Sequence, residues 1–275
     1  MTYVPFALHP VELAAGLTVV LLSGRHVTRG VRMTRLAAVL SWWAVTLWPI
    51  GDIAATHSLS VATAQRLVIM LGVVPLLLRT VSVSTMVRVT RPTAVDAVAS
   101  WLSRPLPALV VVTVGGTLTL SAPLVNAGAT SDIARCVVLM ATLFCGVVLW
   151  LPVLGCVPGA RHLSPAARSG YLFAASLLVT VMSFVWIFSL HPLYPALTHQ
   201  HDVVSLSALA DQQVAGFIAK LGAFLPLWTV AFIIFFRADA EGVPVEESPL
   251  HWADVERHLL RNERRERRHT RRSPR

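Results

Sequence analysis

The feature that most constrains this chain is the alternation of its basic residues between successive polar segments. Long apolar stretches are separated by short polar segments, and arginines occupy every second one of these segments. The arginine-bearing segments hold Arg25, Arg29, Arg32 and Arg35, then Arg79, Arg88, Arg91 and Arg104, then Arg161 and Arg168, and finally the tail from Arg237 onward. The segments between them, 51–65, 122–132 and 191–211, contain neither lysine nor arginine.

This alternation predicts a membrane topology. Loops that stay in the cytoplasm keep lysine and arginine, whereas translocated loops lose them. We therefore expect an all-α polytopic membrane protein with seven transmembrane helices, its N-terminus outside and its C-terminus cytoplasmic. Because an apolar helix needs about 20 residues to cross the hydrocarbon core, we place the spans at about 6–22, 36–52, 62–78, 105–122, 133–154, 170–190 and 212–236.

Two domains follow from these spans. Residues 1–237 form the predicted transmembrane domain, and residues 238–275 form a cytoplasmic charged tail that we expect to be partly disordered. The chain is 55% hydrophobic and only 13% charged, whereas soluble domains carry about 25% charged residues. The net charge of +9 belongs to segments that flank the membrane, so we expect the lipid bilayer rather than nucleic acid as the partner of these arginines.

Catalytic and disulfide chemistry find no support in the sequence. The chain lacks a nucleophile elbow, a P-loop, a dinucleotide fingerprint and an HExxH motif, and we expect no enzymatic activity. Its three cysteines, Cys136, Cys145 and Cys156, show no CxxC spacing. We interpret them as small apolar packing residues.

Two arginines break the loop pattern, because they lie a few residues inside predicted spans. Arg66 and Arg135 are close to the outer ends of the third and fifth spans. Their side chains could extend to the outer interface. Alternatively, they could pair inside the bundle with an outer carboxylate such as Asp52, Asp132 or Asp211.

Lys220, the only lysine of the chain, lies deeper in the last predicted span. Gln213, Gly216, Lys220 and Ala223 share one helix face, and we expect this face to turn into the bundle because a charge facing lipid is costly. Lys220 is therefore a functional candidate. The alternative is a structural hydrogen bond to unwound backbone.

Histidines gather in the predicted outer loops. His57 lies in the second polar segment, and His191, His199 and His201 share the last outer one. Three of these imidazoles could hold copper or zinc. The alternative is that they are ordinary loop histidines, because no ligand spacing among them is diagnostic. No cofactor is required by the sequence, and copper is the one that these residues could bind.

A polar motif at the mouth of the last span carries a family resemblance. Asp211, Gln212 and Gln213 are followed by Gly216, and three further stretches support the motif: 66–78, 146–152 and 190–194. Over about residues 36–242 the chain resembles the CtaG-type cytochrome c oxidase assembly family. We expect Asp211 to cap the last helix, where a carboxylate meets the positive end of the macrodipole, and Gly216 to permit close helix contact.

The resemblance implies a role in oxidase maturation. It predicts a non-catalytic, integral membrane assembly or accessory factor for a haem–copper cytochrome c oxidase, with oxidase subunits as partners, in a bacterial plasma membrane. The alternative is a copper-binding or copper-transport protein that uses the outer histidines, and a receptor-like seven-span protein is a third hypothesis that rests on span count alone.

One departure from the family pattern bears on the copper hypothesis. The resemblance places histidines where this chain has Ala62 and Arg66, Ser121, and the segment 132–136. A permanent guanidinium cation at Arg66 disfavours metal binding. We therefore interpret the chain as a divergent member of the family.

Overall fold

The computed structural model describes residues 9–21, 28–160, 162–194, 197 and 206–240. The chain divides into two compact units, Met1–Ile234 and Phe235–Arg275. The first unit contains the helices and contacts discussed below. The predicted disorder of the charged tail concerns residues that, from 241 onward, lie outside the described part.

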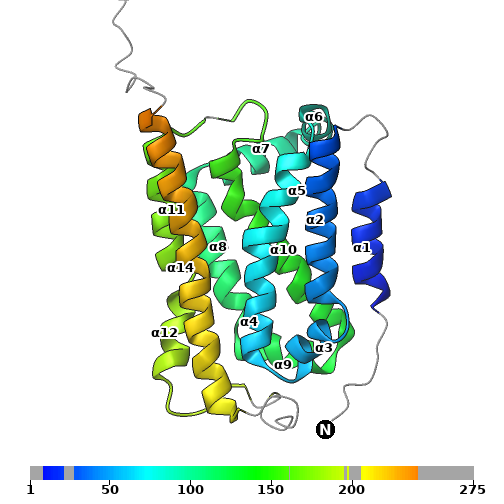
Figure 1. Cartoon of the computed structure of the whole chain (residues 1–275), viewed down its shortest axis with the longest axis vertical. Coiled ribbons are helices and arrows are strands. Elements are labelled where there is room, and N and C mark those ends of the chain that lie inside the picture. Colours follow the sequence, from blue (N-terminus) through cyan, green and yellow to red (C-terminus); the bar gives the residue numbers. More distant parts are fainter. Residues whose placement is uncertain (1–8, 22–27, 161, 195–196, 198–205, 241–275) are drawn as a thin grey trace, which may run out of the picture. The chain divides into compact units, whose positions relative to one another are not determined.

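Every regular element in the described residues is helical, as predicted from the sequence. The elements (Figure 1) are α1 (Pro10–Leu21), α2 (Arg29–Thr46), α3 (Ile50–Thr56), α4 (Leu59–Leu67), the π-helix η1 (Val68–Val73), α5 (Val74–Thr80), α6 (Val83–Val89), α7 (Thr93–Leu102), α8 (Pro105–Thr119), α9 (Ala122–Thr130), α10 (Asp132–Leu154), α11 (Pro165–Leu178), α12 (Val181–Phe188) and α14 (Ala208–Ala240).

The arginine-bearing and arginine-free segments lie at opposite ends of the bundle. Figure 1 shows α6 and α7 at one end, together with the start of α2; we call this the arginine-rich end. The helices α3 and α9 and the start of α14 lie at the other, which we call the arginine-poor end. The alternation seen in the sequence is thus a real segregation in space.

Four helical stretches are long and apolar enough to cross a membrane: Leu59–Thr80, Asp132–Leu154, Pro165–Phe188 and Ala208–Ala238. Two further pairs qualify only when each is taken as one bent span, with bends of 49° between α2 and α3 and 89° between α7 and α8. The described residues therefore contain four to six candidate spans. The first predicted span, 6–22, corresponds to α1, which has 12 residues and is too short to cross alone.

At the arginine-poor end, the prediction of a loop is wrong for two segments, because both are largely helical. Segment 122–132 holds α9, which begins with Pro123 in its first turn, a position where the missing N–H costs nothing. Segment 51–65 holds most of α3 and the start of α4. Correspondingly, the second predicted span, 36–52, starts earlier and breaks: α2 runs from Arg29 to Thr46, and Leu47 is extended.

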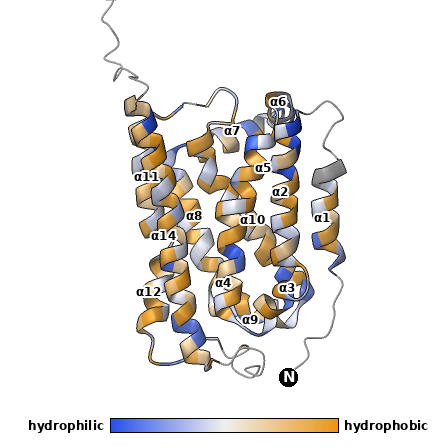
Figure 2. Cartoon of the chain, in the orientation of Figure 1, coloured by the Kyte–Doolittle hydropathy of each residue, from blue (hydrophilic) through white to orange (hydrophobic). Residues whose placement is uncertain are grey.

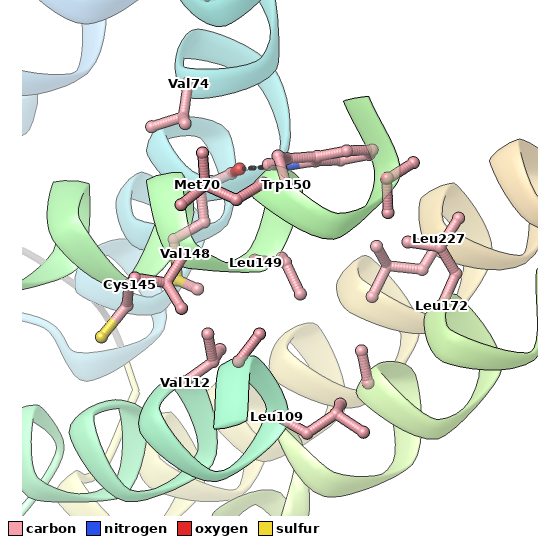
Figure 3. Close-up of a cluster of buried hydrophobic side chains, with 14 of the residues drawn as sticks. Met70, Val74, Leu109, Val112, Cys145, Val148, Leu149, Trp150, Leu172 and Leu227 are labelled. Atoms are coloured by element: carbon pink, nitrogen blue, oxygen red, sulfur yellow. Dashed lines mark hydrogen bonds between the residues drawn. The ribbon is translucent and has the colours of Figure 1, made fainter. Parts of the chain in front are cut away.

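A proline explains the π-helix in the middle of the third span. In η1 the N–H of Val74 bonds to the carbonyl of Ile69, five residues earlier. With the same spacing, the carbonyl of Met70 would accept from the N–H of residue 75. That residue is Pro75, which has no N–H. The indole Nε1 of Trp150 on α10 instead donates to the Met70 carbonyl at 2.9 Å, as Figure 3 shows. A side chain thereby replaces the missing backbone donor.

The bundle core forms around this contact. Ile69, Val112, Val148, Leu149 and Leu172 are each fully buried, and Figure 3 shows side chains of η1, α8, α10, α11 and α14 meeting around Leu149.

The outer surface of the bundle is apolar along the helices. Figure 2 shows hydrophobic residues along most of each helix and hydrophilic ones concentrated towards the helix ends. On α8, Leu106, Val110, Val114 and Leu118 recur every four residues and are all more than half exposed. A stripe of this kind suits contact with lipid tails rather than with water.

Gly146 provides a test of the packing of α10 against η1 and α5. A Cβ at this position would lie 2.9 Å from Cγ2 of Val74 and 3.2 Å from the Cα of Met70. We expect Gly146→Val to lower the free energy of unfolding by about 1–3 kcal/mol through overpacking, measured by thermal unfolding of the full chain in detergent. Gly170→Val is the matched control, because nothing lies within 4 Å of a Cβ there. Equal stabilities of the two variants would contradict this packing.

Candidate functional site

Asp211 joins two helices that are distant in sequence. Its carboxylate accepts hydrogen bonds from the hydroxyl of Ser58 at 2.9 Å, from the N–H groups of Leu59 at 2.6 Å and Ser60 at 3.4 Å, and from the Ser60 hydroxyl. These N–H groups open α4, so the carboxylate meets the positive end of that helix. Asp211 is 7% exposed, and all these bonds are made away from bulk water.

Asp211 therefore does cap a helix, as predicted, but the helix is not the predicted one. Asp211 lies in the first turn of α14, yet it caps α4. The start of α14 is capped by Ser207, whose hydroxyl accepts from the N–H of Ala210 at 3.2 Å. Sequence reasoning missed Ser58 and Ser60, although a serine directly before an apolar helix is a recognisable N-cap signal.

The next two motif residues hold the segment between α12 and α14. The side-chain oxygen of Gln212 accepts from the N–H of Leu193 at 2.8 Å, and its amide donates to the carbonyl of His191 at 3.5 Å. The amide of Gln213 donates to the carbonyl of Ser189 at 3.4 Å. Gln212 is 2% exposed. The two amides thus fix the backbone of segment 189–194 against α14.

Tyr194 fixes the same segment to a third part of the bundle. Its hydroxyl donates to the carbonyl of Leu120, just after α8, at 2.7 Å and accepts from Nε1 of Trp186 at 2.7 Å. Burial raises the pKa of Tyr194 to about 12, against a smaller opposite effect of the Trp186 hydrogen bond. The phenol therefore stays protonated and remains a donor to Leu120.

Gly216, the last motif residue, lets α14 touch α12. A Cβ at this position would lie 2.7 Å from Cγ1 of Ile187 and 2.9 Å from the backbone oxygen of Ser183. Any side chain would push these two helices apart. The structure places Gly216 at the close helix contact expected for it.

Lys220 lies at the break between α11 and α12. Its Nζ donates to the hydroxyl of Thr180 at 3.3 Å and lies 4.6 Å from the centre of the Phe184 ring. The Thr180 hydroxyl in turn donates to the carbonyl of Ser176 at 2.8 Å, one of the last carbonyls of α11. The lysine is thus linked to the end of α11 through one hydroxyl, which resembles the structural alternative left open by the sequence.

Arg66 lies at the end of another helix. Its guanidinium donates to the carbonyl of Gly116 in the last turn of α8 at 3.2 Å. The backbone tightens there, with the N–H of Leu120 bonded to Thr117, so the Gly116 carbonyl accepts from Arg66 and from the Thr119 hydroxyl at 2.9 Å. Among the ion pairs of the described residues, none involves Arg66. Of the two arrangements left open for Arg66, the pairing with a carboxylate is not seen, and its guanidinium contacts a helix terminus instead.

Arg135 does pair with a carboxylate, one of the two arrangements that the sequence left open. Its guanidinium lies 3.2 Å from Oδ1 of Asp52 and 3.9 Å from Oε1 of Glu12. The other Asp52 oxygen lies 3.0 Å from Nε2 of His9. The guanidinium also donates to the carbonyl of Thr46, the last residue of α2, at 3.4 Å.

The three basic residues that break the topology pattern therefore share one environment. Each lies at the C-terminal end of a helix that stops inside the bundle: Arg135 at α2, Arg66 at α8 and Lys220 at α11. These helix ends leave carbonyls without intrahelical partners and carry the negative end of the macrodipole. Arg135 and Arg66 each donate to such a carbonyl, and Lys220 reaches the end of α11 through the Thr180 hydroxyl.

The predicted histidine site is only partly covered by the structure. His57 lies 2.5 Å from the hydroxyl of Thr56 through Nδ1, and His191 is exposed. His199 and His201 lie outside the described residues. Within the described ranges, no group of three His, Cys, Asp or Glu side chains could hold a metal ion. The residues that are described do not form a copper site.

A small cleft adjoins the motif at the arginine-poor end. It is lined by His57, Leu59, Pro192, Tyr194, Leu197, Ala208, Asp211 and Gln212. The carboxylate of Asp211 is already committed to the start of α4. The cleft is therefore a candidate contact surface rather than a site with a free acid or base.

Fold and site together define a helical protein with several membrane-length apolar helices, whose ends at one side are tied together by buried polar residues. The chain belongs to the family of cytochrome c oxidase caa3 assembly factors (Caa3_CtaG), whose model matches residues 13–239. No curated protein and no solved structure matches the chain. The match covers the whole motif from Asp211 to Gly216.

Replacing Asp211 tests whether its charge holds α14 to α4. In Asp211→Asn the amide NH₂ would face the donors that the second carboxylate oxygen now satisfies. Because hydrogen bonds to charged groups contribute about 1.5–3 kcal/mol each, we expect a loss of about 3 kcal/mol in the free energy of unfolding, measured in detergent. Asp96→Asn, at an exposed position on α7, should change it by less than about 0.5 kcal/mol. An unchanged stability of Asp211→Asn would show that the cap contributes little.

Proposed function

We propose that this chain is an integral membrane protein that acts, without catalysing a reaction, in the assembly of a haem–copper cytochrome c oxidase in the bacterial plasma membrane. The observation that carries the proposal is the family match over residues 13–239. It includes the helices of the bundle and the complete polar motif at the start of α14.

The contacts of the motif support a non-catalytic role. Asp211, the one acid of the motif, uses both carboxylate oxygens to accept hydrogen bonds at the start of α4. Gln212 and Gln213 are likewise used to hold backbone. A reaction site needs a group within reach of a substrate and free to exchange a proton. These residues instead give the arginine-poor end a fixed shape, which suits recognition of a client protein.

The surface that we propose for client contact is the cleft and the segment beside it. Three ties hold this part: Asp211 to α4, Gln212 to segment 189–194, and Tyr194 to the end of α8. A surface fixed in advance loses less conformational entropy on binding. We therefore propose that oxidase subunits meet the protein at the arginine-poor end.

We further propose seven crossings, with the N-terminus outside and the C-terminus in the cytoplasm. The four long stretches and the two bent pairs, each contributing one crossing, give six, and the first predicted span, 6–22, is the proposed seventh. The segregation of arginine-bearing segments at the end that holds α6 and α7 (Figure 1) supports this orientation.

Cysteine labelling in cells tests the orientation. In a chain whose three native cysteines are replaced by alanine, we expect Thr130→Cys at the end of α9 to react with a membrane-impermeant maleimide in intact cells. Ser84→Cys in α6 should react only after the membrane is opened. Both positions are exposed, so they form a matched pair. The reverse pattern would overturn the proposed orientation.

Deletion of the gene tests the assembly role. We expect membranes of the deletion strain to lose haem a absorbance and cytochrome c oxidation, and a plasmid with the intact gene to restore both. The reason is that an oxidase without its assembly factor does not acquire its full set of subunits and cofactors. Normal oxidase in the deletion strain would refute the proposal.

A pair of variants separates the motif from general folding in the same strain. Gln213→Ala removes one hydrogen bond to Ser189 at the proposed client surface. Gly170→Ala changes an open position on α11. With equal amounts of protein in the membrane, we expect the first variant to restore less oxidase than the second. Equal restoration would place the client surface elsewhere.

A further inference from the structure

An apolar groove lies where α7 crosses α10. One wall is α7, with Ala94, Val95, Val98, Ala99 and Leu102, and the other is α10, with Phe144, Val147, Val148 and Leu151. All of these side chains are apolar. The groove encloses about 350 Å³, which is at the lower end of the range for pockets that hold small ligands.

The direction of α7 places this groove at a membrane interface. The axis of α7 makes an angle of 89° with that of α8, and α7 lies at the arginine-rich end in Figure 1. Its apolar residues Val95, Val98 and Leu102 face the groove, while Asp96 and Ser100 lie on the other face. A helix with this pattern, perpendicular to a spanning helix, is typical of one that lies in the headgroup region.

Exposed arginines lie close to both ends of α7. Arg91 lies two residues before α7 and Arg104 two residues after it, and Arg88 lies one turn further away in α6. All three are exposed. None of them takes part in an ion pair within the described part of the chain. Asp96 is the only acidic residue between Arg79 and Arg104, so this segment keeps a clear positive excess.

We propose that this groove binds an anionic phospholipid, with an acyl chain along α10 and the phosphate held by an arginine at one end of α7. An apolar channel flanked by exposed arginines matches a molecule that carries an anionic head on an apolar chain. The site is independent of the proposed role in oxidase assembly. It requires only that the bundle lies in a membrane.

Charge distinguishes the possible occupants. The chain's own tail beyond residue 260 is dominated by arginine and would be repelled by the arginines that flank α7, whereas an anionic headgroup is attracted by them.

Native mass spectrometry of the full chain in detergent tests the proposal. The protein is titrated with phosphatidylglycerol and, separately, with phosphatidylcholine of the same acyl chains. We expect one phosphatidylglycerol to be retained at concentrations where phosphatidylcholine is not. The double variant Arg91→Gln, Arg104→Gln should weaken this binding about tenfold or more, because each arginine near an anionic lipid contributes appreciably. Arg29→Gln, Arg32→Gln is the control, since both residues are exposed and lie at the start of α2.

A second pair of variants tests the groove itself. Ala99→Phe fills the channel and should also weaken phosphatidylglycerol binding about tenfold, whereas Val110→Phe on the lipid-facing stripe of α8 should not. Circular dichroism and elution volume verify that each variant is folded. Equal binding of the two lipids, or loss caused by Ala99→Phe without loss in the arginine variant, would overturn the anionic part. Unchanged phosphatidylglycerol binding in Ala99→Phe would show that the lipid does not bind in the groove. Weaker binding in the Arg29→Gln, Arg32→Gln control would show that the net charge of the protein, and not the site at α7, governs the binding.

Discussion

The structure depends on how helix ends are satisfied inside an apolar bundle. The helices α2, α8 and α11 end beside buried residues: Thr46 closes α2, Thr119 closes α8, and Thr180 follows the end of α11. In an environment without water, each unpaired carbonyl would cost several kcal/mol. Cations on three helices that run the opposite way, Arg135 on α10, Arg66 on α4 and Lys220 on α14, meet these ends. The buried cations and the interrupted helix ends therefore stabilise each other.

Asp211 completes the same arrangement with opposite sign. It meets the positive start of α4 as the cations meet negative helix ends. Together with Gln212 and Tyr194, it turns several interrupted helices into one connected end of the bundle. A short, broken helix is normally free to move, and here each break is held by a buried polar contact. This fixed end of the bundle is the surface that we propose for contact with a client protein.

The sequence located the important residues better than it explained them. Arg66, Arg135 and Lys220 stand out because they violate the loop pattern, and the structure gives all three a partner. For Arg135 the partner Asp52 was among the expected carboxylates, whereas for Arg66 it is a backbone carbonyl. A carbonyl partner is invisible in sequence, since every residue has one. The helices α3 and α9 were taken for loops for a different reason. Their lack of arginine indicated a side of the membrane, but it did not indicate a conformation.

The sequence by itself determined the all-helical class, the approximate position of the long spans and the alternation of charge between the two ends, because hydrophobic length and arginine placement are local properties. Only the tertiary structure decided which helix ends the polar residues serve. Asp211 was expected to cap its own helix and caps α4 instead, across 152 residues of sequence to Leu59. That pairing arises from packing α14 beside α4, and a contact between distant segments leaves no trace in the residues of either one alone.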